Sequence, residues 1–135
     1  MSGNGGLFAP GRWHTRGKRI VYASSSLALA TLELFVNMQI KRQLARYVKS
    51  RMVIPETLIE PLESSALKAF LTEPDLFGSP SYGDAWLAEV RSCVLEVPSR
   101  VIPQEANYLI NPLHPAFDQI TVSTDAYEAD ERLLL

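Results

Sequence analysis

Glu33 is the residue whose position in this sequence most needs a chemical explanation. It is the only ionisable side chain between Leu27 and Val36, and it shares a helical face with Leu29 and Val36. A carboxylate on an apolar face is partly desolvated, which costs free energy unless partners are supplied. Such residues cluster at functional sites, and an ion pair with an arginine is the structural alternative. We take Glu33 as a candidate catalytic carboxylate.

Arg12 is the second candidate, because it lies between Gly11 and Trp13. A guanidinium is the natural bidentate ligand of phosphate or carboxylate, and a glycine lets a ligand approach the backbone. A surface arginine stacked on Trp13 is the alternative, and the local sequence alone slightly favours it.

Four further polar residues stand at the ends of apolar segments. Tyr22 ends an apolar strand, where it either buries its ring or offers an aromatic platform to a flat ligand. Ser99 follows Pro98 at a kink, so its hydroxyl can point into a cleft or cap the local backbone. Asn107 and Asn111 frame the run YLI, and the turn-forming role is favoured over ligand contact. We retain Tyr22, Trp13 and Asn107 as substrate-binding candidates.

Common catalytic and metal-binding signatures are missing from the sequence. There is no Walker loop, GxSxG or HExxH, and the two histidines, His14 and His114, have no nearby ligand pattern. The single cysteine, Cys93, lies in the apolar run CVLEV and is expected to be a buried structural thiol in a reducing compartment. We expect no bound metal.

Composition is that of one globular domain. The chain has 135 residues, 47% of them hydrophobic and 21% charged, with a net charge of -2. Near-neutral charge does not favour nucleic acid or an anionic membrane as partner. The apolar segment LALATLELFV is too short to span a bilayer, and the start MSGNGG does not resemble a signal peptide. We expect a cytoplasmic protein.

Strands and helices are predicted to be mixed along the chain. Residues 1–11 are Gly-rich and predict a loop, residues 19–23 a strand, and residues 27–38 a helix whose N-cap oxygen comes from Ser24, Ser25 or Ser26. Residues 46–54 predict a strand, 56–81 short helical pieces and loop, and 82–92 an amphipathic helix. Strands are expected at 93–97, 100–102 and 119–123, which together favour a single α+β domain with small mixed or antiparallel sheets and flanking helices.

Taken together, three segments of the sequence resemble the RES domain family. They are GNGGLFAPGRWH at residues 3–14, VYASSSLALATLE at 21–33 and VPSRVIPQEANYLINPLHPAF at 97–117. GDAWL at 83–87 also fits the family, whereas residues 37–77 match it least. The family's namesake Arg, Glu and Ser would fall on Arg12, Glu33 and Ser99, with Tyr22 as the customary fourth residue.

The resemblance implies a bacterial toxin of a type II toxin–antitoxin pair that consumes NAD, with a fold similar to that of ADP-ribosyltransferase toxins. NAD would be the substrate, no bound cofactor would be needed, and a small Xre-like helix-turn-helix antitoxin would be the protein partner. Glu33 would stabilise an oxocarbenium-like state, Arg12 would hold the pyrophosphate, Tyr22 would orient the nicotinamide, and Ser99 would hydrogen-bond the ribose or amide.

The resemblance leaves the acceptor of ADP-ribose open between water, phosphate and a protein side chain. RES proteins usually carry a further N-terminal strand with an arginine, and we expect both to be absent ahead of MSGNGG. A catalytically inactive, antitoxin-binding remnant is therefore a third interpretation. Homo-oligomer formation stays open.

Overall fold

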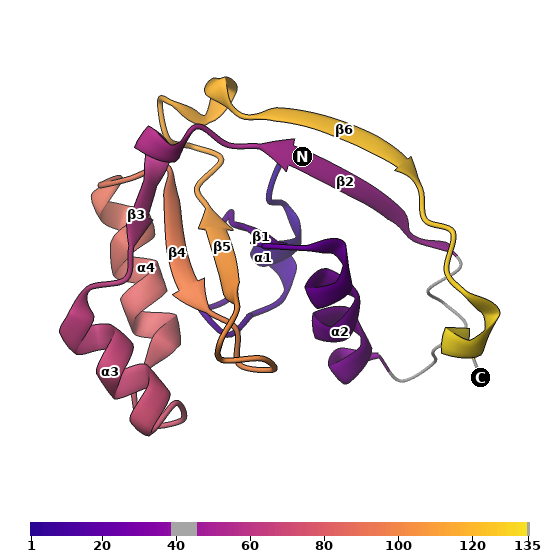
Figure 1. Ribbon diagram of the computed structural model, residues 1–135. Helices are drawn as coiled ribbons and strands as arrows, with labels where there is room; N and C mark the ends of the chain where they lie inside the picture. The colour runs from indigo at the N-terminus through magenta and orange to yellow at the C-terminus, as the bar shows by residue number, and fades with distance from the viewer. Residues whose placement is uncertain (39–45, 135) are drawn as a thin grey trace.

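The computed structural model describes residues 1–38 and 46–134 (Figure 1). Its helices are α1 (Gly5–Phe8), α2 (Leu27–Asn37), α3 (Ser64–Thr72) and α4 (Ser79–Glu89), and its strands are β1 (Val21–Ser24), β2 (Val48–Val53), β3 (Ile59–Pro61), β4 (Val94–Pro98), β5 (Ala106–Ile110) and β6 (Thr121–Ala126). Short 3-10 turns lie at Glu56–Leu58, Phe117–Gln119 and Glu131–Leu134.

A four-stranded sheet with the strand order β1-β5-β4-β3 forms the centre of the molecule. β5 pairs antiparallel with both β1 and β4, whereas β3 pairs parallel with β4. Helices α3 and α4 lie beside β3 and β4, and α2 lies on the other side of the sheet, beyond β1 (Figure 1). This arrangement confirms the α+β fold class.

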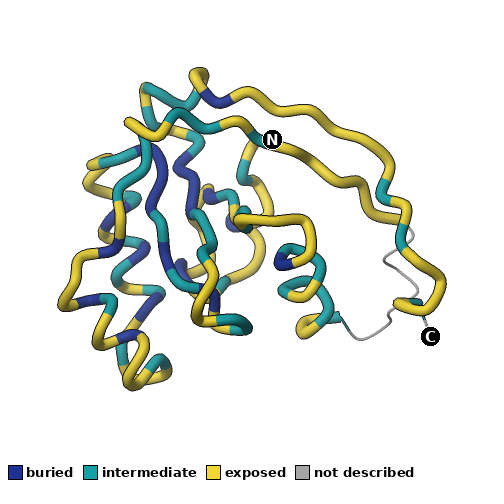
Figure 2. The backbone as a smooth tube through the Cα atoms, in the orientation of Figure 1, coloured by how far each residue is buried: buried dark blue, intermediate teal, exposed yellow. Residues whose placement is uncertain are grey.

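Alternation along β4 and β5 sends apolar side chains to both faces of the sheet. Leu95 and Leu109 belong to the core cluster that includes Phe70 of α3 and Trp86 of α4. Val94 of β4 and Ile110 of β5 belong to a second core cluster on the opposite face. Because successive strand residues point to opposite faces, both faces are covered here, and no residue of the two inner strands is exposed (Figure 2).

The helices form where the sequence provides caps and a buried face. The Ser26 hydroxyl accepts a hydrogen bond from the Leu29 N–H at 3.1 Å, which confirms a serine N-cap for α2. In α4 the buried residues Ser79, Gly83 and Trp86 are spaced by four and three, as expected for one face of a helix. No helix in the described part of the chain is long and apolar enough to cross a membrane.

β2 and β6 form a separate antiparallel ribbon that arches away from the central sheet (Figures 1 and 2). Its register runs from Val48 opposite Ala126 to Val53 opposite Thr121. Apart from the half-buried Met52, its residues are exposed. The predicted strands at 46–54 and 119–123 are thus confirmed.

Two segments have a secondary structure other than the one predicted from the sequence. Residues 5–8, predicted as loop, form the short helix α1, and residues 100–102, predicted as strand, form a turn. The turn arises because the N–H groups of Val101 and Ile102 donate to the Ser99 hydroxyl, at 3.1 and 3.0 Å, instead of to a neighbouring strand. The segment 56–81 contains short elements as predicted, together with the nine-residue helix α3.

Gly83 is the point where α4 meets the N-terminal loop, because a Cβ there would overlap the carbonyl of Trp13. We predict that Gly83→Ala lowers the free energy of unfolding by about 1–3 kcal/mol, since overpacking outweighs the gain in helix propensity. Gly5→Ala is the matched control, because no atom lies within 4 Å of a Cβ at Gly5 in α1. Denaturant unfolding of both variants checks the prediction, and equal stability of the two would contradict it.

Candidate functional site

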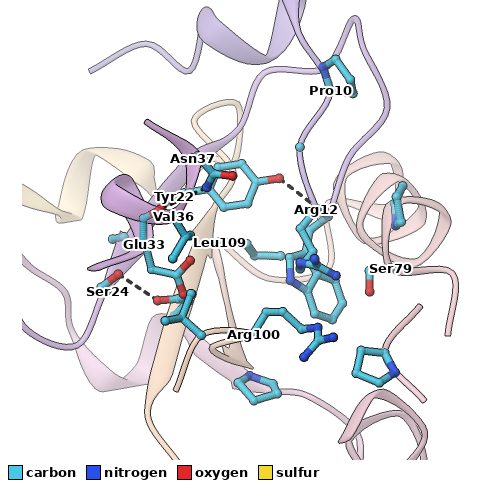
Figure 3. Close-up of a pocket in the computed structure, with 18 of the residues that line it drawn as sticks. Pro10, Arg12, Tyr22, Ser24, Glu33, Val36, Asn37, Ser79, Arg100 and Leu109 are labelled. Carbon is cyan, nitrogen blue, oxygen red and sulfur yellow. Dashed lines mark hydrogen bonds between the residues drawn. The ribbon is translucent and has the colours of Figure 1, made fainter. Parts of the chain in front are cut away.

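A cleft of about 830 Å³ opens between α2, the loop at residues 10–13 and the beginning of α4. Residues of β1 and β5 lie between these walls, among them Tyr22 and Asn107. Figure 3 shows Glu33 and Ser24 on one side of this cleft and Ser79 on the other. Segments far apart in the sequence therefore supply one cavity.

Glu33 lies on the cleft wall formed by α2 and is held there by neutral donors. Its Oε1 accepts a hydrogen bond from the Ser99 hydroxyl at 2.6 Å and another from Asn107 Nδ2 at 2.7 Å. Ion pairs in the described residues join Arg91 to two glutamates and Arg132 to an aspartate, so no described cation pairs with Glu33. The structural ion pair considered from the sequence is absent from this part of the chain.

One oxygen of the Glu33 carboxylate is thus fixed, whereas no described residue donates to Oε2. Two short hydrogen bonds to Oε1 set the orientation of the carboxylate and leave its second oxygen for a ligand. Both donors are neutral, so they orient the carboxylate without pairing it with a cation.

Ser99 is fully buried, at 0% exposure, and all its hydrogen-bonding capacity is used. The hydroxyl donates to Glu33 and accepts from two backbone N–H groups in the turn that follows β4. The Ser99 hydroxyl is thus occupied by Glu33 and by the turn, and it holds the Glu33 carboxylate in place. The contact with a substrate that the resemblance implied stays a prediction.

Asn107 is a strand residue of β5, so the turn-forming role favoured from the sequence is wrong. Its amide donates to Glu33, and its Oδ1 accepts from the Ser24 hydroxyl at 2.8 Å. Ser24 stands directly opposite Asn107 in the β1–β5 register. Asn111 does form a turn, because its Oδ1 accepts from the Leu113 N–H.

Tyr22 presents its ring to the cleft while its hydroxyl is tied to the N-terminal loop. The residue is 42% exposed and lines the cleft. Its oxygen accepts from the Trp13 N–H at 3.2 Å and lies 2.6 Å from His14 Nδ1. Because His14 Nε2 must donate to the Ala9 carbonyl, at 2.9 Å, the neutral imidazole accepts the hydrogen bond of the Tyr22 O–H at Nδ1.

These contacts place the phenol among groups that favour its neutral form. Burial of the hydroxyl raises the pKa of Tyr22 from 10.0 to about 12, against a smaller lowering by the Trp13 N–H, and the charge of Asp84 raises it further. Tyr22 is therefore a protonated, fixed aromatic wall and not a base.

Trp13 faces the core, although its edge reaches the cleft. It is 3% exposed and stacks on Phe70 with ring centroids 5.2 Å apart, while Phe77 and Tyr82 meet it edge-on. The ring is thus part of the core cluster and not a surface plate for Arg12. Its role as a substrate-binding residue stays a prediction.

Arg12 is exposed and lines the cleft, as does Arg100, which the sequence analysis did not single out. Arg100 follows Ser99 in the turn after β4, so the cleft gains a second cation from a segment that also positions Glu33. The structure thus brings Arg12, Tyr22, Glu33 and Asn107 to one cavity, with Ser99 behind them. Sequence reasoning missed Arg100, His14 and Ser24; the GRWH run was the signal that could have drawn attention to His14.

The chain is similar to known toxins over nearly its whole length. A family model of the RES domain matches residues 1–133. Toxin Res of Pseudomonas putida is 31% identical over 137 residues, which cover 98% of this chain and 92% of that protein. The Prs ADP-ribosylating toxin of a Sphingobium species is 37% identical over 120 residues, covering 85% of this chain and 74% of the relative. Toxin Res of Photorhabdus laumondii is 31% identical, covering 98% and 87%.

The raised pKa of Tyr22 gives a test of the site's geometry by alkaline titration. Between pH 10 and 12 the unfolded state releases this proton and the folded state keeps it, so the stability contributed by Tyr22 is lost over that range. We predict that Tyr22→Phe removes one phenol from the late-titrating absorbance of the five tyrosines. Burial also raises the pKa of Tyr108. Tyr22→Phe should therefore remove the absorbance change of one phenol from the late step, and the contribution of Tyr108 should remain.

Tyr47→Phe is the control for this titration, since Tyr47 is exposed and lies outside the cleft. The amplitude of the late step is compared between the two variants. If Tyr22→Phe leaves that amplitude unchanged, the Tyr22 hydroxyl is not buried as described.

Proposed function

This chain belongs to the RES domain family, and we propose that it is a toxin that breaks the nicotinamide–ribose bond of NAD by hydrolysis or phosphorolysis. The observation that carries the proposal is the Glu33 carboxylate, held by Ser99 and Asn107 in a cleft that Arg12 also lines. A fixed carboxylate and a guanidinium in one cleft suit a dinucleotide, because its nicotinamide ring is cationic and its pyrophosphate is anionic.

The reaction needs stabilisation of positive charge at the sugar carbon. As the bond from ribose C1′ to the nicotinamide nitrogen breaks, its electron pair leaves with neutral nicotinamide and the ribose becomes oxocarbenium-like. Glu33 Oε2 is the oxygen placed to stabilise that charge or to hold a ribose hydroxyl, and a dry cleft strengthens the interaction. A water or phosphate oxygen then bonds to C1′, with loss of one proton from water, giving ADP-ribose or ADP-ribose-1″-phosphate.

The other cleft residues bind and orient. Arg12 and Arg100 offer guanidinium groups to the pyrophosphate, and the exposed face of Tyr22 offers a surface for the nicotinamide ring. Ser99 and Asn107 act through Glu33, whose orientation they fix. No bound cofactor enters this scheme, because NAD itself is the substrate.

Transfer of ADP-ribose to a protein is the second candidate function. It is favoured by the 37% identity to a relative named as an ADP-ribosylating toxin. The bond-breaking half of the reaction is the same, and only the acceptor differs.

We further propose that the protein is cytoplasmic and that its partner is a cognate antitoxin of Xre-like type, as membership of the toxin family implies. Such an antitoxin would cover the cleft. A single RES domain spanning residues 1–135 is sufficient for this scheme, and neither nucleic acid nor a membrane takes part in it. Slowed growth on expression of the chain, relieved by the antitoxin, is the cellular result expected.

Glu33→Gln is the sharpest test of the proposed reaction. The amide Oε1 can still accept from Ser99 and Asn107, whereas the charge and the second acceptor oxygen are lost. We predict at least a ~100-fold fall in nicotinamide release with an unchanged melting temperature, in line with the loss of one preorganised electrostatic group. Chromatography of NAD, nicotinamide and ADP-ribose measures the result.

The wild-type products separate the candidate functions. Free ADP-ribose indicates hydrolysis, ADP-ribose-1″-phosphate indicates phosphorolysis, and a labelled protein band in cell extract indicates transfer. Intact NAD in every mixture would refute the proposal and favour an inactive antitoxin-binding protein. Full turnover by the Glu33→Gln variant would remove the carboxylate from the mechanism.

Arg12→Ala tests the binding role of the first arginine. We predict a KM for NAD about tenfold higher with kcat little changed, because loss of one charge-assisted contact to phosphate costs roughly 1.5 kcal/mol. Arg16→Ala is the matched control, since Arg16 is exposed nearby but lies outside the cleft lining. Equal KM values for the two variants would show that Arg12 does not contact the substrate.

A further inference from the structure

The beginning of α4 forms the cleft wall opposite Glu33, and the scheme above does not use it. Gly78, Ser79 and Pro80 all line the cleft there. Figure 3 shows Ser79 on the far side of the cavity from Glu33. An eleven-residue helix thus begins at the site.

The Ser79 hydroxyl has no hydrogen-bond partner among the described residues, although the residue is only 3% exposed. Buried hydroxyls are nearly always paired, because leaving one unpaired costs free energy. Close packing of α4 explains a small residue at this position, but alanine would fill the same space without that cost. The unpaired hydroxyl on a cleft wall therefore indicates a ligand.

The first turn of α4 adds further free donors. Its N-cap is Gly78, in a left-handed conformation with φ of 75°, and no side chain caps the helix. The backbone N–H groups of Ser79 and Ser81 lie in the turn where the helix offers no acceptor, and no acidic residue stands in that turn to neutralise the positive end of the dipole.

Two arginines in the same cleft supply counter-charge for an anion. Arg12 and Arg100 both line it, as do the carboxylates Glu33 and Asp75. Asp75 is exposed like the two arginines, where water and salt screen all three charges, so the end of the helix and not the side-chain charge favours an anion here. Helix N-termini with free N–H groups bind phosphate for these reasons.

We propose that Ser79 and the N-terminus of α4 bind a phosphate group, either from the pyrophosphate of the dinucleotide or from inorganic phosphate that serves as acceptor. The assignment to NAD rests on the proposed function, whereas phosphate binding itself does not. Ser79 Oγ donates to a phosphate oxygen, and the first-turn N–H groups donate beside it. The two arginines supply the counter-charge.

Calorimetric titration of the full chain with ADP, adenosine and inorganic phosphate tests this site. Ser79→Ala should weaken ADP binding roughly tenfold, the equivalent of one charge-assisted hydrogen bond, and leave adenosine binding unchanged. Ser79→Asp should weaken it further by repulsion, although an acidic first turn favours the helix itself. Ser81→Ala is the matched control in the same turn, since its exposed side chain lies outside the cleft lining.

Kinetics with NAD identify the source of the phosphate. A higher KM for NAD in Ser79→Ala assigns the site to the dinucleotide, and loss of the rate increase produced by added phosphate assigns it to the acceptor. Unchanged binding of ADP and of phosphate by Ser79→Ala would overturn the proposal, whatever Ser79→Asp does. If wild type releases no nicotinamide but binds ADP through Ser79, the proposed function fails and the phosphate site stands.

Discussion

The cleft depends on a carboxylate that is held in place without a cation. Glu33 projects from α2, while the groups that fix it come from the turn after β4 and from β5. A neighbouring arginine would anchor the side chain as firmly, but it would cancel the charge that the proposed reaction needs. Neutral hydroxyl and amide donors orient the carboxylate and leave its charge available, and this requires α2 to pack beside the sheet at the level where β4 ends.

Around this anion the cleft carries charges of both signs. Glu33 stands on the α2 wall, the beginning of α4 lies on the far side of the cavity, and Arg12 and Arg100 line the same cleft (Figure 3). NAD, the proposed substrate, also carries both signs, with a cationic nicotinamide ring at one end and an anionic pyrophosphate further along. The protonated Tyr22 ring lies within the same cleft, where it can orient the nicotinamide without adding charge. Complementary charges of this kind fix the orientation of a charged ligand in a cleft and favour it over ligands that lack those charges.

Sequence reasoning reached the parts of this structure that local pattern determines. A lone carboxylate in an apolar helix marked Glu33, and a serine run before that helix marked its N-cap. It missed what depends on partners distant in the chain. The turn at 100–102 exists because Ser99 captures two N–H groups, although β-branched residues there favour a strand. The local sequence around Asn107 resembles a turn, and its position in a strand follows from pairing with β1, which places Ser24 opposite it. Likewise, the hydrogen bond between His14 and Tyr22 depends on the fold that brings the two side chains together.

The contacts of Trp13 explain why the local sequence could not distinguish a structural role from a ligand-binding role for the run Arg-Trp-His. Its ring stacks on Phe70 in the core, its carbonyl lies against Gly83 of α4, and its N–H holds the Tyr22 hydroxyl. The loop that carries Arg12 is consequently tied to the core, to the helix and to the sheet at the same residue. A loop fixed in this way loses little further freedom when a ligand binds, so less of the binding energy is spent on ordering the site. The same packing sets the position of α4, whose first residues line the cleft.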